Sequence, residues 1–164
     1  MNQTRRPVGE VLRWIVDVLA ESRVPYQLVG GVAAQVYGAT REIVDIDFYI
    51  PGAGFATILP EVQEYLVFGP GHYHDENWDL VYMQLLRWYW QIELAAAETA
   101  RFYDRAGEVW VDANIDFRAA EMCDLHGVTV AVMPKHQLVD YKRRLGREVD
   151  LVDIEQINRG WPEG

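Results

Sequence analysis

The sequence predicts a single α+β domain over residues 1–164, in which helices flank a mixed β-sheet and the chain closes with a β-hairpin and two helices. Three observations lead to this fold class. The length of 164 residues and the mass of 18.9 kDa match one ordinary domain. Half of the residues are apolar and 24% are charged, which is a globular composition. Apolar residues recur at helical spacing in some segments and form β-type runs in others, without internal repeats.

In the first half of the chain, helical and β-type segments alternate. The apolar residues of 8–23 and 53–66 recur with the i, i+3/i+4, i+7 spacing of amphipathic helices. β-branched and aromatic residues fill 26–29 and 42–50, and glycine or proline follows each run. The predicted order is helix 8–23, strand 26–29, helix 32–37, strand 42–50 and helix 53–66.

The second half is predicted to be mostly β structure before two closing helices. The aromatic run 78–96 is too long for one strand, so we expect two antiparallel strands with a turn near 86–88. His126-Gly127 predicts a hairpin between 120–125 and 128–133. The other expected segments are a turn and polar loop over 69–77, a helical or irregular segment over 97–105, a weak strand over 108–117, and helices over 134–145 and 147–158.

The charge and cysteine content exclude several classes of protein. Twenty-five acidic residues against fifteen basic ones give a net charge of −10, which disfavours a broad nucleic-acid surface. Cys123 is the only cysteine, so no internal disulfide is expected. Residues 81–97 are the most apolar stretch, but polar and charged residues interrupt it, so no membrane partner is predicted. We therefore expect a cytoplasmic protein.

Two acidic residues and a pair of glycines form the most informative pattern. Asp45 and Asp47 lie two apart in a predicted strand, so both carboxylates project from the same face. Paired carboxylates supply the hard oxygen ligands that Mg²⁺ prefers, and they can bridge two metal ions. Gly30-Gly31 stands between a predicted strand and a helix, where the backbone can approach an anionic ligand closely.

A two-metal site needs a third carboxylate from a neighbouring strand. Glu93 is the best candidate, because it is an isolated acid within an apolar β-type run. Asp116 is the rival, with Asp112 behind it, and the sequence leaves this choice open.

The arrangement of Gly30-Gly31, Gly38, Arg41 and Asp45-Ile46-Asp47 resembles the polymerase-beta-like nucleotidyltransferase superfamily. It is most similar to the small single-domain group that includes AbiEii-type toxin, lincosamide and aminoglycoside nucleotidyltransferases. The C-terminal stretch, 127–153, resembles the closing hairpin and helices of that group.

The resemblance implies roles for individual residues. Gly30 and Gly31 hold the phosphates of a nucleoside triphosphate, and Arg41 and Lys142 are further candidates for phosphate binding. Asp45, Asp47 and Glu93 bind Mg²⁺, with two metal ions expected, and the third acid also deprotonates an acceptor hydroxyl. Asp150 and Asp153 lie on one helical face, and we expect them to pair with Lys142 or Arg147 and to hold the last two helices together.

The resemblance implies an Mg²⁺-dependent enzyme that moves a nucleoside monophosphate from a triphosphate to an acceptor hydroxyl and releases pyrophosphate. A toxin-like or an antibiotic-resistance-like enzyme fits equally well. The net charge favours a cationic small molecule or a protein over tRNA as acceptor. The alternative is a catalytically inactive nucleotide- or partner-binding module of the same fold, since Gly31, Val44 and Glu93 depart from the commoner residues of the superfamily.

Overall fold

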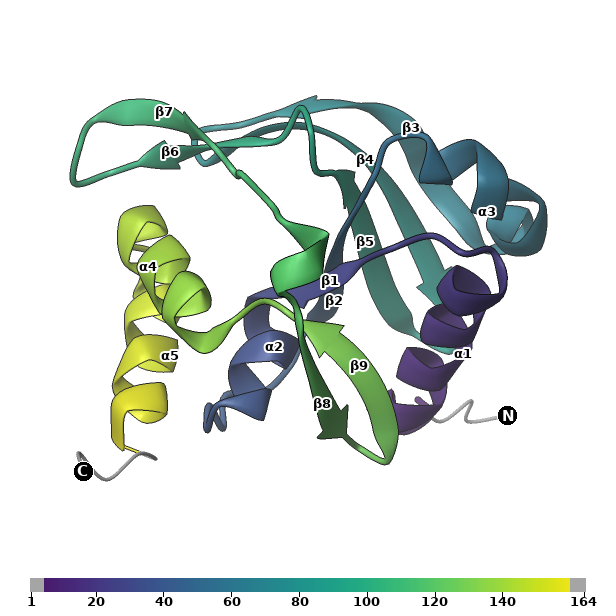
Figure 1. The fold of residues 1–164 in the computed structure, drawn as a ribbon, viewed down its shortest axis with the longest axis horizontal. Coiled ribbons are helices and arrows are strands. Elements are labelled where there is room, and N and C mark those ends of the chain that lie inside the picture. The colour runs from purple at the N-terminus through teal and green to yellow at the C-terminus, as the bar shows by residue number, and fades with distance from the viewer. Residues whose placement is uncertain (1–4, 160–164) are drawn as a thin grey trace.

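The structure is a computed structural model that describes residues 5–159 (Figure 1). Residues 1–4 and 160–164 of the predicted domain lie outside this range. The helices are α1 (Val8–Glu21), α2 (Gly30–Val36), α3 (Gly54–Val62), α4 (Lys135–Leu145) and α5 (Glu148–Arg159). The strands are β1 (Gln27–Val29), β2 (Asp45–Ile50), β3 (Leu66–His74), β4 (Trp78–Arg87), β5 (Trp90–Ala96), β6 (Arg101–Asp104), β7 (Val109–Asp112), β8 (Glu121–Leu125) and β9 (Val128–Val132).

All nine strands of residues 5–159 belong to one mixed sheet, which confirms the predicted α+β class. The strand order is β7-β6-β4-β5-β2-β1-β9-β8, and β3 pairs with β4 beside this path. Two neighbouring pairs are parallel, β2 with β5 and β1 with β9, while the other pairs are antiparallel. The parallel pairing of β2 with β5 matters most, because it sets two acid-bearing strands side by side.

The sheet has one apolar face and one face with polar side chains. Figure 1 shows α1 and α3 at one end of the curved sheet and α4 and α5 at the other. In β2, Ile46, Phe48 and Ile50 are buried in the core. Ile92 and Leu94 of β5 join the same core. Because side chains alternate along a strand, the residues between these ones must project from the opposite face.

Several predicted segments differ from the structure; the strand predicted over 108–117, for example, covers only Val109–Asp112. The turn and loop predicted over 69–77 is largely strand β3, and the segment 97–105 contains strand β6. The helix predicted over 53–66 ends at Val62. In β3, the pairing register with β4 shifts between Phe68 and Gly71, so Gly69-Pro70 lies in an irregular part of the strand. A proline is tolerated there because β3 pairs on one side only and the missing N–H costs no ladder bond.

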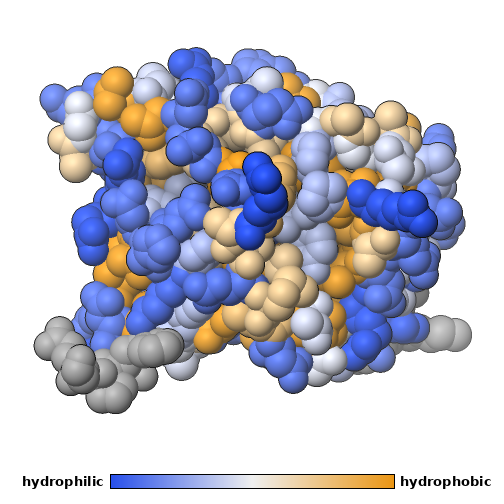
Figure 2. Space-filling view, viewed as in Figure 1, coloured by the Kyte–Doolittle hydropathy of each residue, from blue (hydrophilic) through white to orange (hydrophobic). Residues whose placement is uncertain are grey.

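The surface of the molecule is mixed in character. Figure 2 shows hydrophilic residues over most of the visible face, with apolar residues in separate patches between them. Every helix in residues 5–159 is too short or too polar to span a lipid bilayer.

Candidate active site

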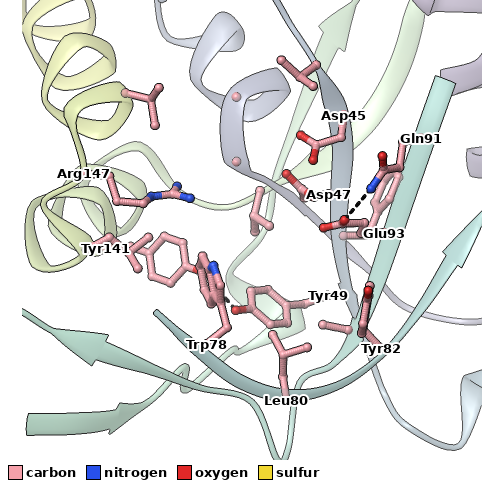
Figure 3. Close-up of a pocket in the computed structure, with 18 of the residues that line it drawn as sticks. Asp45, Asp47, Tyr49, Trp78, Leu80, Tyr82, Gln91, Glu93, Tyr141 and Arg147 are labelled. Atoms are coloured by element: carbon pink, nitrogen blue, oxygen red, sulfur yellow. Dashed lines mark hydrogen bonds between the residues drawn. The ribbon is translucent and has the colours of Figure 1, made fainter. Parts of the chain in front are cut away.

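Three carboxylates meet on the polar face of the sheet. Asp45 and Asp47 come from β2, and Glu93 comes from the parallel neighbour β5, where it lies opposite Asp47 in the register. One carboxylate oxygen from each of the three lies within 4.8 Å of the others. Figure 3 shows the three side chains converging on one point. We call these three residues the acidic triad.

The acidic triad is partly buried, and its negative charge is concentrated. Burial and the charges of Asp45 and Glu93 raise the pKa of Asp47 well above its usual value. Burial followed by the charge of Asp45 raises the pKa of Glu93, and burial raises that of Asp45. Such a cluster of oxygen ligands fits a hard divalent cation, whose charge would offset the repulsion between these carboxylates.

Amide groups on both sides fix the orientation of Glu93. The Nε2 atoms of Gln91 and Gln84 donate to its Oε1 over 2.8 Å and 3.4 Å. Gln84 stands directly opposite Glu93 on the antiparallel strand β4. The third carboxylate is therefore held in place by the sheet itself, as a preorganised ligand must be.

The raised pKa values predict how stability and metal binding depend on pH. The folded state retains protons on these carboxyls at a pH where the unfolded chain has lost them. The stability of the metal-free protein must therefore fall as pH rises from the ordinary carboxyl range through the raised pKa values. Binding of Mg²⁺ must in turn release protons, and its affinity must rise with pH over the same range.

Calorimetric titration of Mg²⁺ in two buffers of different ionisation enthalpy checks this prediction. We expect a net proton release that shrinks in Asp47→Asn. A release that is absent, or equal in both proteins, would contradict the assignment of these raised pKa values to the triad.

The two glycines allow close contacts with neighbouring side chains. Gly30 begins α2 with a φ of +69°, and a Cβ built on it would lie 2.5 Å from Asp47 Oδ2. A Cβ on Gly31 would lie 2.9 Å from Arg41 Nη2. Any larger residue at either position would displace an acid of the triad or a neighbouring guanidinium. The glycine turn thus brings backbone within reach of the triad.

A chain of alternating charges lies beside the triad and joins α4 and α5 to the loop before β2. Its members, which we call the charge network, are Arg41, Asp153, Lys142, Asp150 and Arg147. Arg41 Nε and Nη2 donate to the two carboxylate oxygens of Asp153 at 3.0 Å and 2.9 Å. Lys142 Nζ lies 2.9 Å from Oδ2 of the same aspartate. Lys142 also donates to Asp150 at 3.4 Å.

Arg147 completes the charge network and faces the triad. Its Nε and Nη2 donate to Asp150 at 2.7 Å and 3.1 Å. Figure 3 shows the guanidinium group pointing across the pocket toward Asp47. Burial lowers the pKa of Arg147, but the hydrogen bond and charge of Asp150, with smaller contributions from Tyr141 and Asp47, outweigh it and raise the pKa overall, so this residue remains a cation. The predicted pairing of Asp150 and Asp153 with Lys142 and Arg147 is confirmed.

A cavity of about 550 Å³ lies between these groups, and they line it together. The triad forms one wall, the glycine turn another, and Arg41 and Arg147 bring positive charge from the side of the helices. Aromatic and apolar side chains from β3 and β4 line the remaining side. A pocket of this size accommodates a small organic ligand.

The sequence-predicted site residues fall into three groups. Asp45, Asp47, Glu93, Gly30, Gly31 and Arg41 all line the pocket. Asp116 and Asp112, the rival acids, lie exposed and outside the triad. Lys142 borders the pocket, but its side chain is only 2% exposed and its ammonium group is held by two buried aspartates.

The sequence did not predict the direction of Arg147 or the aromatic side of the pocket. Arg147 was predicted as a partner of the aspartates, but its direction toward Asp47 depends on the packing of α5. The aromatic side of the pocket was not predicted. Its signal was present in the alternation of Trp78, Leu80 and Tyr82 along one strand face.

Comparisons with known proteins identify the fold. A scan of protein-family models gave no match to this chain, and a search of curated proteins gave none either. A candidate nucleotidyltransferase from Thermotoga maritima superposes with a TM-score of 0.68 at 19% identity, covering 98% of this chain and 100% of the other. The chain has the nucleotidyltransferase fold.

Two antibiotic-modifying enzymes share this nucleotidyltransferase fold. The lincosamide antibiotic adenylyltransferase LnuA, solved with lincomycin, matches with a TM-score of 0.63 at 14% identity over 93% of this chain and 97% of the other. The enzyme ANT(2″)-Ia, solved with adenylyl-2″-tobramycin, matches with a TM-score of 0.60 at 16% identity over 92% and 87% of the two chains.

Proposed function

We propose that this protein is an Mg²⁺-dependent nucleotidyltransferase that moves a nucleoside monophosphate from a nucleoside triphosphate to a hydroxyl group of a small molecule. The observation that carries the proposal is the acidic triad, which faces a positively charged wall across one pocket on a nucleotidyltransferase fold. This reaction needs metal ligands and cationic groups for the phosphates, and one cavity offers carboxylates and arginines suited to these two roles.

The charges of the pocket support binding of a triphosphate. Arg41 and Arg147 are cations that line the cavity, and each is anchored to a buried aspartate by two hydrogen bonds. Their fixed orientation avoids the entropy loss of ordering a free side chain on a ligand. Gly30 and Gly31 allow the phosphates to approach the main chain next to the triad.

The triad residues then act as ligands and as a proton acceptor. When bound to the triad, Mg²⁺ supplies charge neutralisation for the triphosphate and the departing pyrophosphate. Glu93, oriented by Gln84 and Gln91, accepts the proton of the acceptor hydroxyl. The hydroxyl oxygen forms a bond to the α-phosphorus, and the bond from the α-phosphorus to the bridging oxygen of pyrophosphate breaks. Arg147 stabilises negative charge on the phosphates during this step.

A small-molecule acceptor is supported by two neighbours of the fold. LnuA was solved with lincomycin and ANT(2″)-Ia with an adenylylated tobramycin. Both ligands are hydroxyl-bearing small molecules, and the cavity of this chain has a volume suited to that class. An antibiotic-resistance-like role therefore has more support than modification of tRNA.

A transfer assay tests the proposal. The protein is incubated with Mg²⁺, each of the four ribonucleoside triphosphates and a panel of hydroxyl-bearing small molecules, including lincomycin and tobramycin. We expect pyrophosphate release and an acceptor whose mass rises by one nucleoside monophosphate, and neither in Asp45→Ala. Binding of nucleotide without any transfer product over the whole panel would instead favour the inactive binding module.

A further inference from the structure

One side of the pocket is lined mainly by aromatic and apolar side chains of β3 and β4. Side chains two residues apart share one face of a strand, so Trp78, Leu80, Tyr82 and Gln84 of β4 all project from the face that carries the triad. Tyr73 of β3 lies opposite Leu80, and its ring is 5.4 Å from that of Tyr82. We call Tyr73, Trp78, Leu80 and Tyr82 the aromatic strip. Figure 3 shows its three β4 members below the triad.

The aromatic strip begins at the triad and extends toward Arg147, whose guanidinium carbon lies 5.7 Å from the centre of the Trp78 ring. Gln84 lies two residues beyond Tyr82 on the same strand face and donates to Glu93. Tyr82 is therefore the ring next to the proposed proton acceptor. At roughly 3.3 Å per residue, the strip reaches about 13 Å from Tyr82 to Trp78. All three β4 members are only partly buried, and Tyr73 is 39% exposed. The strip is therefore open to a ligand with one or more rings.

The geometry of the proposed reaction indicates whether the aromatic strip contacts the triphosphate or the acceptor. The attacking oxygen and the leaving pyrophosphate lie roughly in line on opposite sides of the α-phosphorus. The anionic triphosphate is drawn to Arg41 and Arg147, which border the cavity on the side of α4 and α5. The acceptor then approaches from the side of Glu93, where the aromatic strip begins at Tyr82.

The charge of the strip limits the charge of the acceptor. Among the described residues that line the pocket, Asp75 is the one acid outside the triad. Its carboxylate is already engaged, because Oδ2 accepts from the Tyr73 hydroxyl at 2.7 Å and Oδ1 accepts from the N–H groups of Asn77 and Trp78 at 2.8 Å and 2.7 Å. A compound with several ammonium groups would therefore find no free carboxylate along the strip with which to form ion pairs.

We propose, building on the proposed function, that the acceptor is a small hydroxyl compound with an apolar or aromatic ring face and at most one positive charge. It packs its ring face on the aromatic strip and directs its hydroxyl to Glu93. Aromatic side chains supply a large contact area with defined stacking geometry, which suits recognition of a ring more than of a charge. The net charge of −10 is thus not a guide to the acceptor, because little of it lies on the strip.

Binding of three defined probes tests this assignment. The probes are p-nitrophenyl β-D-glucoside, which is neutral, lincomycin, which carries one basic amine, and tobramycin, which carries several. Their dissociation constants are measured calorimetrically on wild type, Tyr82→Ser and the matched control Tyr89→Ser. Tyr89 is exposed and lies in the turn between β4 and β5, outside the pocket. Tyr73→Ser is the second test variant if Tyr82→Ser does not fold.

We expect the two ring-faced, weakly charged probes to bind more tightly than tobramycin. Their affinity should fall about tenfold in Tyr82→Ser and stay unchanged in Tyr89→Ser. The proposal is overturned if tobramycin binds most tightly, if neither of the other probes binds, or if Tyr82→Ser and Tyr73→Ser bind them as wild type does. Failure of the proposed function has a separate readout, because wild type would then show no Mg²⁺-dependent binding of a triphosphate. If the proposed function holds, Tyr82→Ser should bind the triphosphate as wild type does.

Discussion

Replacing Asp47 with asparagine is expected to lower nucleotidyl transfer at least about a thousandfold, a barrier increase of roughly 4 kcal/mol. The amide keeps the shape of the side chain but removes one ligand charge from the centre of the triad. The same substitution should leave the metal-free fold at least as stable as wild type, because it removes a buried carboxyl whose pKa is raised by its acidic neighbours. Activity and stability therefore move in opposite directions.

Steady-state transfer kinetics and thermal unfolding without Mg²⁺ measure the two effects. Asp124→Asn is a matched control, since Asp124 is exposed on β8 and lies outside the triad. Its activity should equal that of wild type. Retention of wild-type turnover by Asp47→Asn would exclude the triad as the catalytic metal site. A marked drop in its melting temperature would show that the loss of activity comes from unfolding.

Replacing Lys142 with methionine is expected to destabilise the fold by about 3 kcal/mol. Lys142 is only 2% exposed, and its ammonium group lies between Asp150 and Asp153, which are both fully buried. Methionine fills much of the same volume but leaves these carboxylates without their shared cation. Each aspartate keeps one arginine, which places the cost at the lower end of that for breaking a buried pair.

Urea unfolding of four proteins measures this cost. The exposed neighbour Arg143, replaced by methionine, is the matched control and should change stability by less than about 0.5 kcal/mol. The double variant Lys142→Met with Asp153→Asn should recover part of the loss, because one unpaired charge is removed. Equal unfolding midpoints for Lys142→Met and Arg143→Met would refute the view that the charge network holds α4 and α5 in place.

Much of the fold follows from local patterns in the sequence. The closing hairpin was predicted because His126-Gly127 separates two β-type runs. The run 78–96 was divided into two strands because it is longer than an ordinary strand, and the structure has β4 and β5 there. Strand β3 was missed because Gly69-Pro70 and the polar residues after it are typical of a loop. Pairing with β4 overrides that local preference, and such pairing is a property of the sheet that no short segment encodes.

The acidic triad could be predicted in outline for a different reason. Period-two spacing places Asp45 and Asp47 on one strand face, whatever the neighbouring strands are. The choice of Glu93 over Asp116 depended on which strand lies beside β2, and the parallel register of β2 with β5 settles the geometry. The burial of Lys142 and the direction of Arg147 depend on how α5 packs, which the spacing of charges alone does not reveal.

Calorimetric titration of each nucleoside triphosphate, with and without Mg²⁺, tests the central claim most directly when wild type is compared with Asp45→Ala. The claim is that the acidic triad holds the metal through which the nucleotide binds. The account predicts binding by wild type that requires Mg²⁺ and is lost in Asp45→Ala. Nucleotide binding that is independent of Mg²⁺, or equally strong in Asp45→Ala, would contradict it.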